Sequence, residues 1–129
     1  SYMKHNGGLL FRSITKKKFE FKTKIKKSHL NKAGITHGGY ICTIIDAGAG
    51  TAAHRSSGNR PCVTISLDVK FITPSELGDE LIGTVEIIKI TKSMVFLNCK
   101  LRLKNKLISS AAGIWKILKR PLPNAGLGG

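Results

Sequence analysis

One segment, NKAGITHGGYICTIID (Asn31 to Asp46), organises the rest of this chain. Its first half contains turn formers and ends in His37-Gly38-Gly39, which predicts a tight entry into a helix. Residues 40–45 are apolar almost all round, and such a helix is normally buried. Asp46 then lies inside that helix, where burying an unpaired carboxylate would be costly. We therefore interpret Asp46 as the centre of a site whose other half is His37, Gly38 and Gly39.

Length and composition predict one folded domain. The chain has 129 residues, of which 41% are hydrophobic, enough for a real core. No apolar run is long enough to span a membrane, and the N-terminal residues lack a secretory pattern. Three widely spaced cysteines without a Cys-x-x-Cys pair favour reduced core thiols over a disulfide frame or a zinc site. These features predict a cytoplasmic protein without a bound metal.

Positive charge is concentrated near the N-terminus. The net charge is +15, and residues 1–32 hold ten Lys/Arg against a single acid, Glu20. Such a cluster attracts polyanions, but a lysine-rich surface exposed to solvent is the simpler interpretation, and we favour it. Single-strand nucleic-acid binders need exposed aromatic platforms, whereas only 6% of this chain is aromatic and those residues fit a core. We therefore do not expect nucleic acid as a partner.

Hydrophobic periodicity predicts a two-layer α+β domain with one long helix and five strands. We expect an N-terminal arm over residues 1–18, in which Leu9 to Phe11 form a short helical turn or a packing arm. The domain covers residues 19–120, and residues 121–129 form a flexible tail. The helix is expected from about Gly38 to His54. The strands are expected at 19–25, 62–72, 81–90, 94–103 and 107–118.

Side-chain alternation assigns faces within the strand at 62–72. Val63, Ile65, Leu67, Val69 and Phe71 are expected on one face, with Thr64, Ser66, Asp68 and Lys70 on the other. Of the histidines, His29 and His54 are expected at the surface.

The spacing Asn31-x5-His37-Gly38-Gly39-x6-Asp46 on this scaffold resembles that of the hotdog-fold thioesterases. Within them it is most similar to the PaaI-like branch of the 4-hydroxybenzoyl-CoA thioesterase superfamily, over residues 19–118. The resemblance implies a central helix wrapped by an antiparallel sheet of strand order 1-3-4-5-2. It also implies hydrolysis of an acyl-CoA to CoA and free acid, by a homodimer or a dimer of dimers. CoA is part of the substrate, so no separate cofactor is expected.

Thioester hydrolysis gives each site residue a role. The Gly38 N–H at the start of the helix, with Gly39 beside it, is expected to polarise the thioester carbonyl. Asp46 acts as general base or as nucleophile. His37 donates near the sulfur or fixes the loop, and Asn31 is a donor or a loop cap. By resemblance, Thr64 helps to hold the water.

Helix geometry implies that the site needs two chains. Gly38 and Asp46 are eight residues apart, or about 12 Å along the helix axis, so one carbonyl cannot contact both. A symmetric dimer with antiparallel helices brings Gly38 of one chain to Asp46 of the other. For the phosphates of CoA, the expected contacts are Arg60, Lys92 and Ser93. Relatives often carry Gly where this chain has Thr91, before that basic residue.

Other activities of the same fold remain as alternatives. Some hotdog proteins bind acyl-CoA without hydrolysing it, and this is the main alternative. Others are hydratases, which need an Asp and a His close together on the helix. Here Asp46 and His54 are eight residues apart, which argues against a hydratase.

Overall fold

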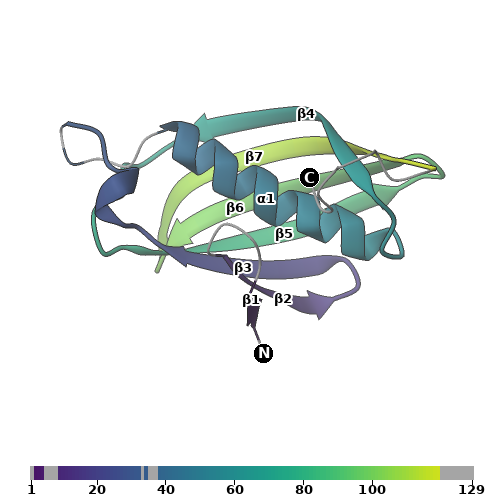
Figure 1. The fold of residues 1–129 in the computed structure, drawn as a ribbon, viewed down its shortest axis with the longest axis horizontal. Helices are drawn as coiled ribbons and strands as arrows, with labels where there is room; N and C mark the ends of the chain where they lie inside the picture. Colours follow the sequence, from purple (N-terminus) through teal and green to yellow (C-terminus); the bar gives the residue numbers. More distant parts are fainter. Residues whose placement is uncertain (1, 5–8, 33, 35–37, 120–129) are drawn as a thin grey trace.

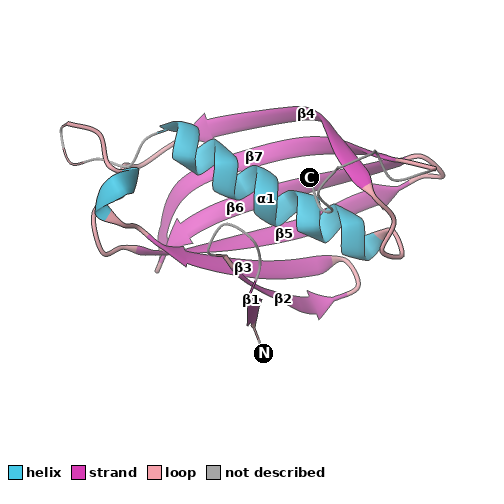
Figure 2. Cartoon of the chain, in the orientation of Figure 1, coloured by secondary structure: helices cyan, strands magenta, loops and turns pink. Residues whose placement is uncertain are grey.

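The computed structural model describes residues 2–4, 9–32, 34 and 38–119. It contains one long α-helix lying across one face of a single antiparallel sheet (Figures 1 and 2). The elements are, in chain order, β1 (Met3–Lys4), β2 (Leu10–Thr15), β3 (Lys18–Lys24), the 3-10 helix η1 (Lys27–His29), α1 (Gly38–Ser56), β4 (Cys62–Phe71), β5 (Glu80–Ile90), β6 (Met94–Leu103) and β7 (Lys106–Ile117). The α+β class, the helix and the five expected strands are confirmed, each boundary within two residues.

The sheet has seven strands in the order β1-β2-β3-β5-β6-β7-β4. Its last five members follow the expected order 1-3-4-5-2, but the expected count of five is wrong because β1 and β2 extend the sheet beyond β3. Part of the expected arm is therefore a strand, and a helical turn at Leu9 to Phe11 is wrong. The side chains of Leu9 and Phe11 are buried, with the alternation of a strand. A bulge between Ser13 and Thr15 breaks that alternation and leaves Ile14 44% exposed.

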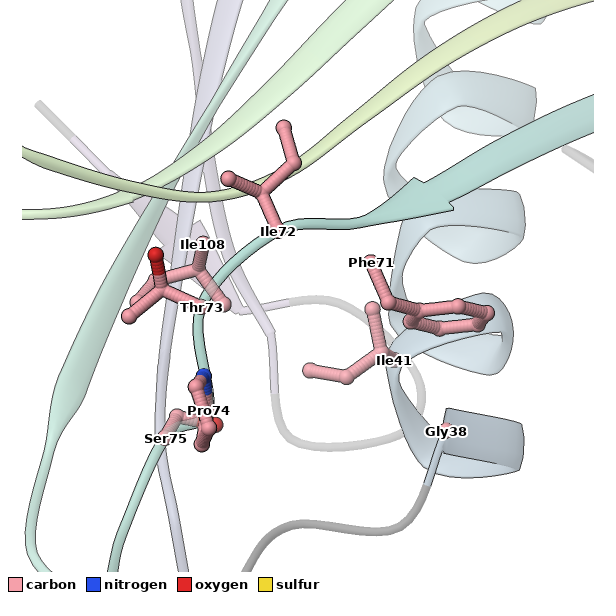
Figure 3. Close-up of a pocket in the computed structure, with 8 residues that line it drawn as sticks. All are labelled: Gly38, Ile41, Phe71, Ile72, Thr73, Pro74, Ser75 and Ile108. Atoms are coloured by element: carbon pink, nitrogen blue, oxygen red, sulfur yellow. The ribbon is translucent and has the colours of Figure 1, made fainter.

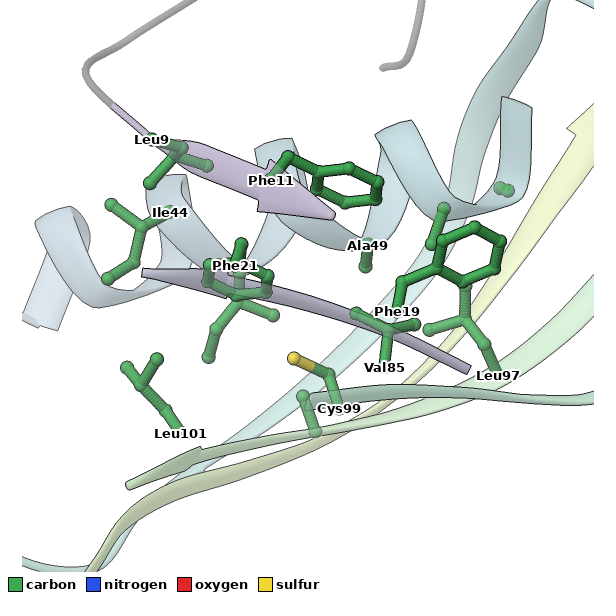
Figure 4. Close-up of a cluster of buried hydrophobic side chains, with 14 of the residues drawn as sticks. Leu9, Phe11, Phe19, Phe21, Ile44, Ala49, Val85, Leu97, Cys99 and Leu101 are labelled. Atoms are coloured by element: carbon green, nitrogen blue, oxygen red, sulfur yellow. The ribbon is translucent and has the colours of Figure 1, made fainter. Parts of the chain in front are cut away.

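The core lies between α1 and the sheet, and Phe21 is at its centre (Figure 4). The ring of Phe21 occupies the space that side chains would take at two glycines. A Cβ at Gly48 of α1 would lie 2.3 Å from the ring, and a Cβ at Gly83 of β5 would lie 2.1 Å from it. Small residues at these two positions let the helix pack closely on the sheet. This close packing sets the depth at which the helix residues, including Asp46, lie above the strands.

The helix ends in residues that stop it. Gly58 and Asn59 both have positive φ, at 80° and 59°, which ends the helical path. The chain then turns into β4, and the Ser57 hydroxyl donates to the His54 carbonyl at 3.0 Å. Among the described residues, no helix has the length and apolar character needed to cross a membrane.

All three cysteines are free thiols. Cys62 and Cys99 are buried in the core, and Cys42 of α1 is half-buried. Burial raises the pKa of the Cys62 thiol, and it raises that of Cys99 to about 12. These two thiols are therefore protonated at neutral pH, which matches the expectation of core cysteines. The expected tail at 121–129 lies outside the described residues.

The two edges of the sheet differ in length. β4 is ten residues long and pairs only with β7 among the described strands, whereas the opposite edge is the two-residue β1. Two large apolar side chains of β4, Ile65 and Phe71, are 50% and 59% exposed. A long apolar edge of this kind is a natural place for another chain to pair.

Candidate active site

The start of α1 presents two exposed glycines. A Cβ at Gly39 would have no neighbour within 4 Å, and one at Gly38 would meet only the Phe71 ring, at 3.5 Å. The first N–H groups of any helix lack intrahelical partners and carry the positive end of the helix dipole. A carbonyl oxygen can therefore approach this point without meeting a side chain of either glycine. His37, expected to act here, lies outside the described residues.

Asp46 lies two turns further along α1, half-buried, and it has one hydrogen-bond partner. The Thr64 hydroxyl on β4 donates to Asp46 Oδ1 at 2.7 Å. No hydrogen bond to Oδ2 occurs within the described part of the chain. The hydroxyl thus fixes one carboxylate oxygen while the other remains open for a water or a substrate.

A bulge in β4 brings Thr64 to this position. The register with β7 pairs Thr64 with Trp115 and Leu67 with Gly113, so one extra residue lies between them. The expected faces are therefore wrong at this end of the strand. Thr64 and Leu67 share the helix side, whereas Ile65, expected with Leu67, is 50% exposed. The alternating pattern could not reveal this shift, because a bulge leaves no mark in the hydrophobic period.

Stacked rings join the loop before the helix to the helix itself. The His29 and Tyr40 rings lie 3.7 Å apart and nearly parallel, at 11°. The Lys26 N–H donates to His29 Nδ1 at 3.0 Å, and Asn31 follows in a turn in which its carbonyl accepts from the Gly34 N–H at 3.0 Å. His29 is still partly exposed, in agreement with its expected surface position, and its ring contact with Tyr40 is an addition to that expectation. Its pKa is lowered by partial burial and by the neighbouring Lys26 charge.

The expected phosphate contacts lie together at the other end of the molecule. The Leu118 N–H donates to the Pro61 carbonyl and the Ile117 N–H to the Ser93 carbonyl, both at 2.8 Å. The loops carrying Arg60 and Lys92 therefore flank the same end of β7. This end is near the C-terminus of α1, about 28 Å from Gly38 for a helix of 19 residues.

Three side chains shape these loops. His54, expected at the surface, is half-buried, and its Nδ1 donates to the Arg60 carbonyl at 2.7 Å. Arg60 Nε in turn donates to the Ser57 carbonyl at 2.6 Å. In the other loop, the Thr91 hydroxyl accepts from the N–H groups of Ser93 and Met94, at 3.4 and 3.0 Å. The Thr91 side chain thus stabilises the turn at the position where relatives often carry a glycine.

Comparison with known proteins identifies the class. The family model of the thioesterase superfamily matches residues 33–108. Acyl-coenzyme A thioesterase 13 of Mus musculus is 29% identical over 73 residues, which are 57% of this chain and 52% of that protein, so the chain spans about half the length of this relative. The chain belongs to the thioesterase superfamily.

Solved structures agree with this family assignment. Thioesterase superfamily member 2 of Mus musculus has a TM-score of 0.73 and 26% identity, covering 84% of this chain and 80% of that one. A mutant of the phenylacetic acid degradation protein PaaI from Thermus thermophilus has a TM-score of 0.78 and 18% identity, covering 86% and 94%. The hotdog fold and the resemblance to hotdog-fold thioesterases are therefore confirmed, and the PaaI protein shares this fold.

Proposed function

We propose that this chain hydrolyses an acyl-CoA thioester to CoA and a free carboxylic acid. The observation that carries the proposal is the Asp46 carboxylate, which accepts a hydrogen bond of 2.7 Å from the Thr64 hydroxyl of β4. Asp46 lies on the same helix that begins with the two unobstructed glycines, Gly38 and Gly39. The thioesterase family and the name of the mouse relative support hydrolysis of a thioester in general. The acyl-CoA substrate and the roles of these residues are our proposal.

In this mechanism the thioester carbonyl accepts a hydrogen bond from the Gly38 N–H, with Gly39 leaving room beside it. The positive end of the helix dipole stabilises the negative charge that develops on that oxygen. Asp46 either removes a proton from the attacking water or attacks the carbonyl carbon itself. In the first route water adds to the carbonyl carbon, the C–S bond breaks, and the CoA thiolate takes up the proton. In the second route the C–S bond breaks to give a mixed anhydride on Asp46, which a water then hydrolyses to the free acid. Thr64 holds the carboxylate in place for both routes, and His37 and Asn31 position the thioester or its loop.

The active site is proposed to form between two copies of the chain. Gly38 and Asp46 of one chain are about 12 Å apart along α1, too far for one carbonyl to contact both. Pairing of β4 with β4 of a second copy would satisfy the exposed edge and set the two helices antiparallel. The Gly38 N–H donor of one protomer then faces the Asp46 carboxylate of its partner. Arg60, Lys92 and Ser93 would contact the phosphates of CoA.

The first test is thiol release from a panel of acyl-CoAs by the native protein and by Asp46→Ala. We expect Asp46→Ala to fold and to bind CoA in a calorimeter, yet to lose at least about a hundredfold in turnover. Asp68→Ala is the matched control, because Asp68 is an exposed carboxylate of β4 paired with Lys70. Near-native turnover of Asp46→Ala would remove this residue from the mechanism. Binding of acyl-CoA by the native protein without any hydrolysis would favour the non-catalytic alternative.

The second test uses proline at the start of the helix. Gly38→Pro removes the N–H donor at the first helical position, where proline is well tolerated, and Gly38→Ala keeps the donor as a control. Because the alanine Cβ would narrow the approach beside the Phe71 ring, we expect some loss of turnover in Gly38→Ala and a far larger loss in Gly38→Pro. Mixing inactive Gly38→Pro with inactive Asp46→Ala should restore about a quarter of the native activity, since half of the random dimers contain one intact site of two. No recovery after verified subunit exchange would exclude a shared site.

A further inference from the structure

An apolar pocket of about 350 Å³ opens beside the first residue of α1 (Figure 3). On one side lie Gly38 and Ile41 of the helix with the Phe71 ring, and on the other the segment that follows β4. Figure 3 shows the Ile41 side chain pointing from the helix toward that segment. Ile108 of β7, only 2% exposed, closes the pocket toward the core.

The described residues that line this pocket carry no charge. Two of its backbone donors are also used, because the N–H groups of Ile72 and Thr73 both donate to the Ile108 carbonyl, at 2.9 and 3.1 Å. The phosphates and amide groups of CoA would lose their water here without gaining enough partners. The hydrocarbon end of an acyl-CoA suffers no such penalty.

We infer that this pocket takes the acyl group of the substrate and that Phe71 is a specificity-determining residue that limits its size. The inference rests on the proposed function and adds a substrate class to it: uncharged aliphatic or aryl acyl groups, with exclusion of acyl groups that end in a carboxylate. A pocket of this volume is at the small end of the range for ligand sites, which favours short to medium chains or a single ring.

The position of Phe71 supports this role. Its ring carbons lie 3.5 Å from the place where a Cβ of Gly38 would be, yet the residue is 59% exposed. An acyl chain whose carbonyl oxygen is bound at the Gly38 N–H therefore runs directly past this ring. A smaller side chain at position 71 would open the pocket without disturbing the buried core.

The experiment measures kcat/KM for thiol release from acetyl-, hexanoyl-, decanoyl-, benzoyl- and glutaryl-CoA. For the native protein we expect hexanoyl-CoA to exceed glutaryl-CoA, of similar length, by at least about a hundredfold, because the terminal carboxylate would be buried unpaired. Phe71→Ala should raise the ratio of decanoyl- to hexanoyl-CoA by at least about tenfold. Ile88→Ala, at an exposed apolar residue of β5 outside this pocket, is the matched control and should keep the native ratios.

A second variant tests the charge argument without shortening a side chain. Ile72 is 50% exposed, so Ile72→Arg can keep its charged end in water while offering it to the pocket. We expect it to raise the ratio of glutaryl- to hexanoyl-CoA by at least about tenfold. Active Phe71→Ala and Ile72→Arg proteins with native ratios would overturn the inference and leave the proposed function intact. Absence of hydrolysis of every acyl-CoA by the native protein would instead overturn the proposed function, and this inference with it.

Discussion

Replacing Gly48 by alanine should disturb both the packing and the proposed catalysis of this protein. The added Cβ would lie 2.3, 2.4 and 2.7 Å from three ring atoms of Phe21, whereas ordinary contacts begin at 3.4 Å. The ring cannot retreat, because it already fills the space over Gly83 on the sheet side. The helix must therefore rise by about 1 Å, the difference between the required and available distances.

Two effects follow from this shift, and their sizes differ. Overpacking costs about 1–3 kcal/mol, which outweighs the gain of about 1 kcal/mol from replacing a helix glycine by alanine. The difference is a net loss of up to about 2 kcal/mol in the free energy of unfolding. Because Asp46 lies only two residues before Gly48, it should also move away from Thr64. Misplacement by about 1 Å costs on the order of a hundredfold in rate, so turnover should fall by about that factor.

Urea unfolding and thiol release measure the two effects separately. Gly39→Ala is the control for unfolding, because its Cβ would have no described neighbour within 4 Å, and its stability should equal the native value or exceed it by up to about 1 kcal/mol. Adding Phe21→Leu to Gly48→Ala should recover part of the stability lost, as expected for two groups in direct contact. A Gly48→Ala protein as stable and as active as the native one would refute the reasoning.

Three further predictions concern the site and the core. Thr64→Val removes the hydroxyl that holds Asp46 and should lower kcat by about ten- to a hundredfold, whereas Thr64→Ser should remain near native; equal rates for the two variants would contradict this role. The pKa of His29 is lowered by partial burial and by Lys26, so neutral His29 contributes stability that is complete above about pH 6.5 and is lost as the pH falls through its folded pKa. His29→Phe keeps a ring against Tyr40, and its unfolding midpoint should change less than that of the native protein between pH 7.5 and 5; parallel curves would argue against this contribution. Cys99, with a pKa of about 12, and Cys62, with a raised pKa, should resist iodoacetamide at pH 8 until the protein unfolds, as followed by mass spectrometry; rapid labelling of either in the folded state would show that the core is more open than described.

The five strands could be predicted because side-chain alternation covers most of each strand, and the helix because a continuous apolar run follows a cluster of turn formers. What the periodicity missed lies at bulges. At Ser13–Thr15 a bulge exposes Ile14 and interrupts the alternation of β2. The alternation is then limited to two buried side chains, Leu9 just before the strand and Phe11 within it, which is too short a pattern to predict a strand. Near Thr64 and near Ile87 the same irregularity turns Ile65 and Ile88 outward. Which residue bulges is decided by the pairing strand, so it is not encoded in local alternation.

Parts of the candidate site could also be predicted, and for a different reason. Asp46 stood out because a carboxylate within an apolar helix is costly, which requires no knowledge of the neighbouring strands. The family resemblance implied only that Thr64 helps to hold the water. Its hydrogen bond to Asp46 was not predicted, since it joins residues 18 positions apart through a bulge. The stack of His29 on Tyr40 gave no signal at all, because polar aromatic residues at such a spacing have no characteristic pattern. The pocket beside Gly38 likewise depends on chain segments that only the folded sheet brings together.

The unequal edges of the sheet limit how copies of this chain can add to one another. Strand β4 offers ten residues for pairing, whereas β1 at the opposite edge offers two. Edge-to-edge growth into a fibre needs two usable edges on every molecule, and among the described strands a copy joined through β4 has no second long edge to extend. Association through these described edges would therefore end at a closed pair, which would protect a strongly β-structured protein from open-ended aggregation.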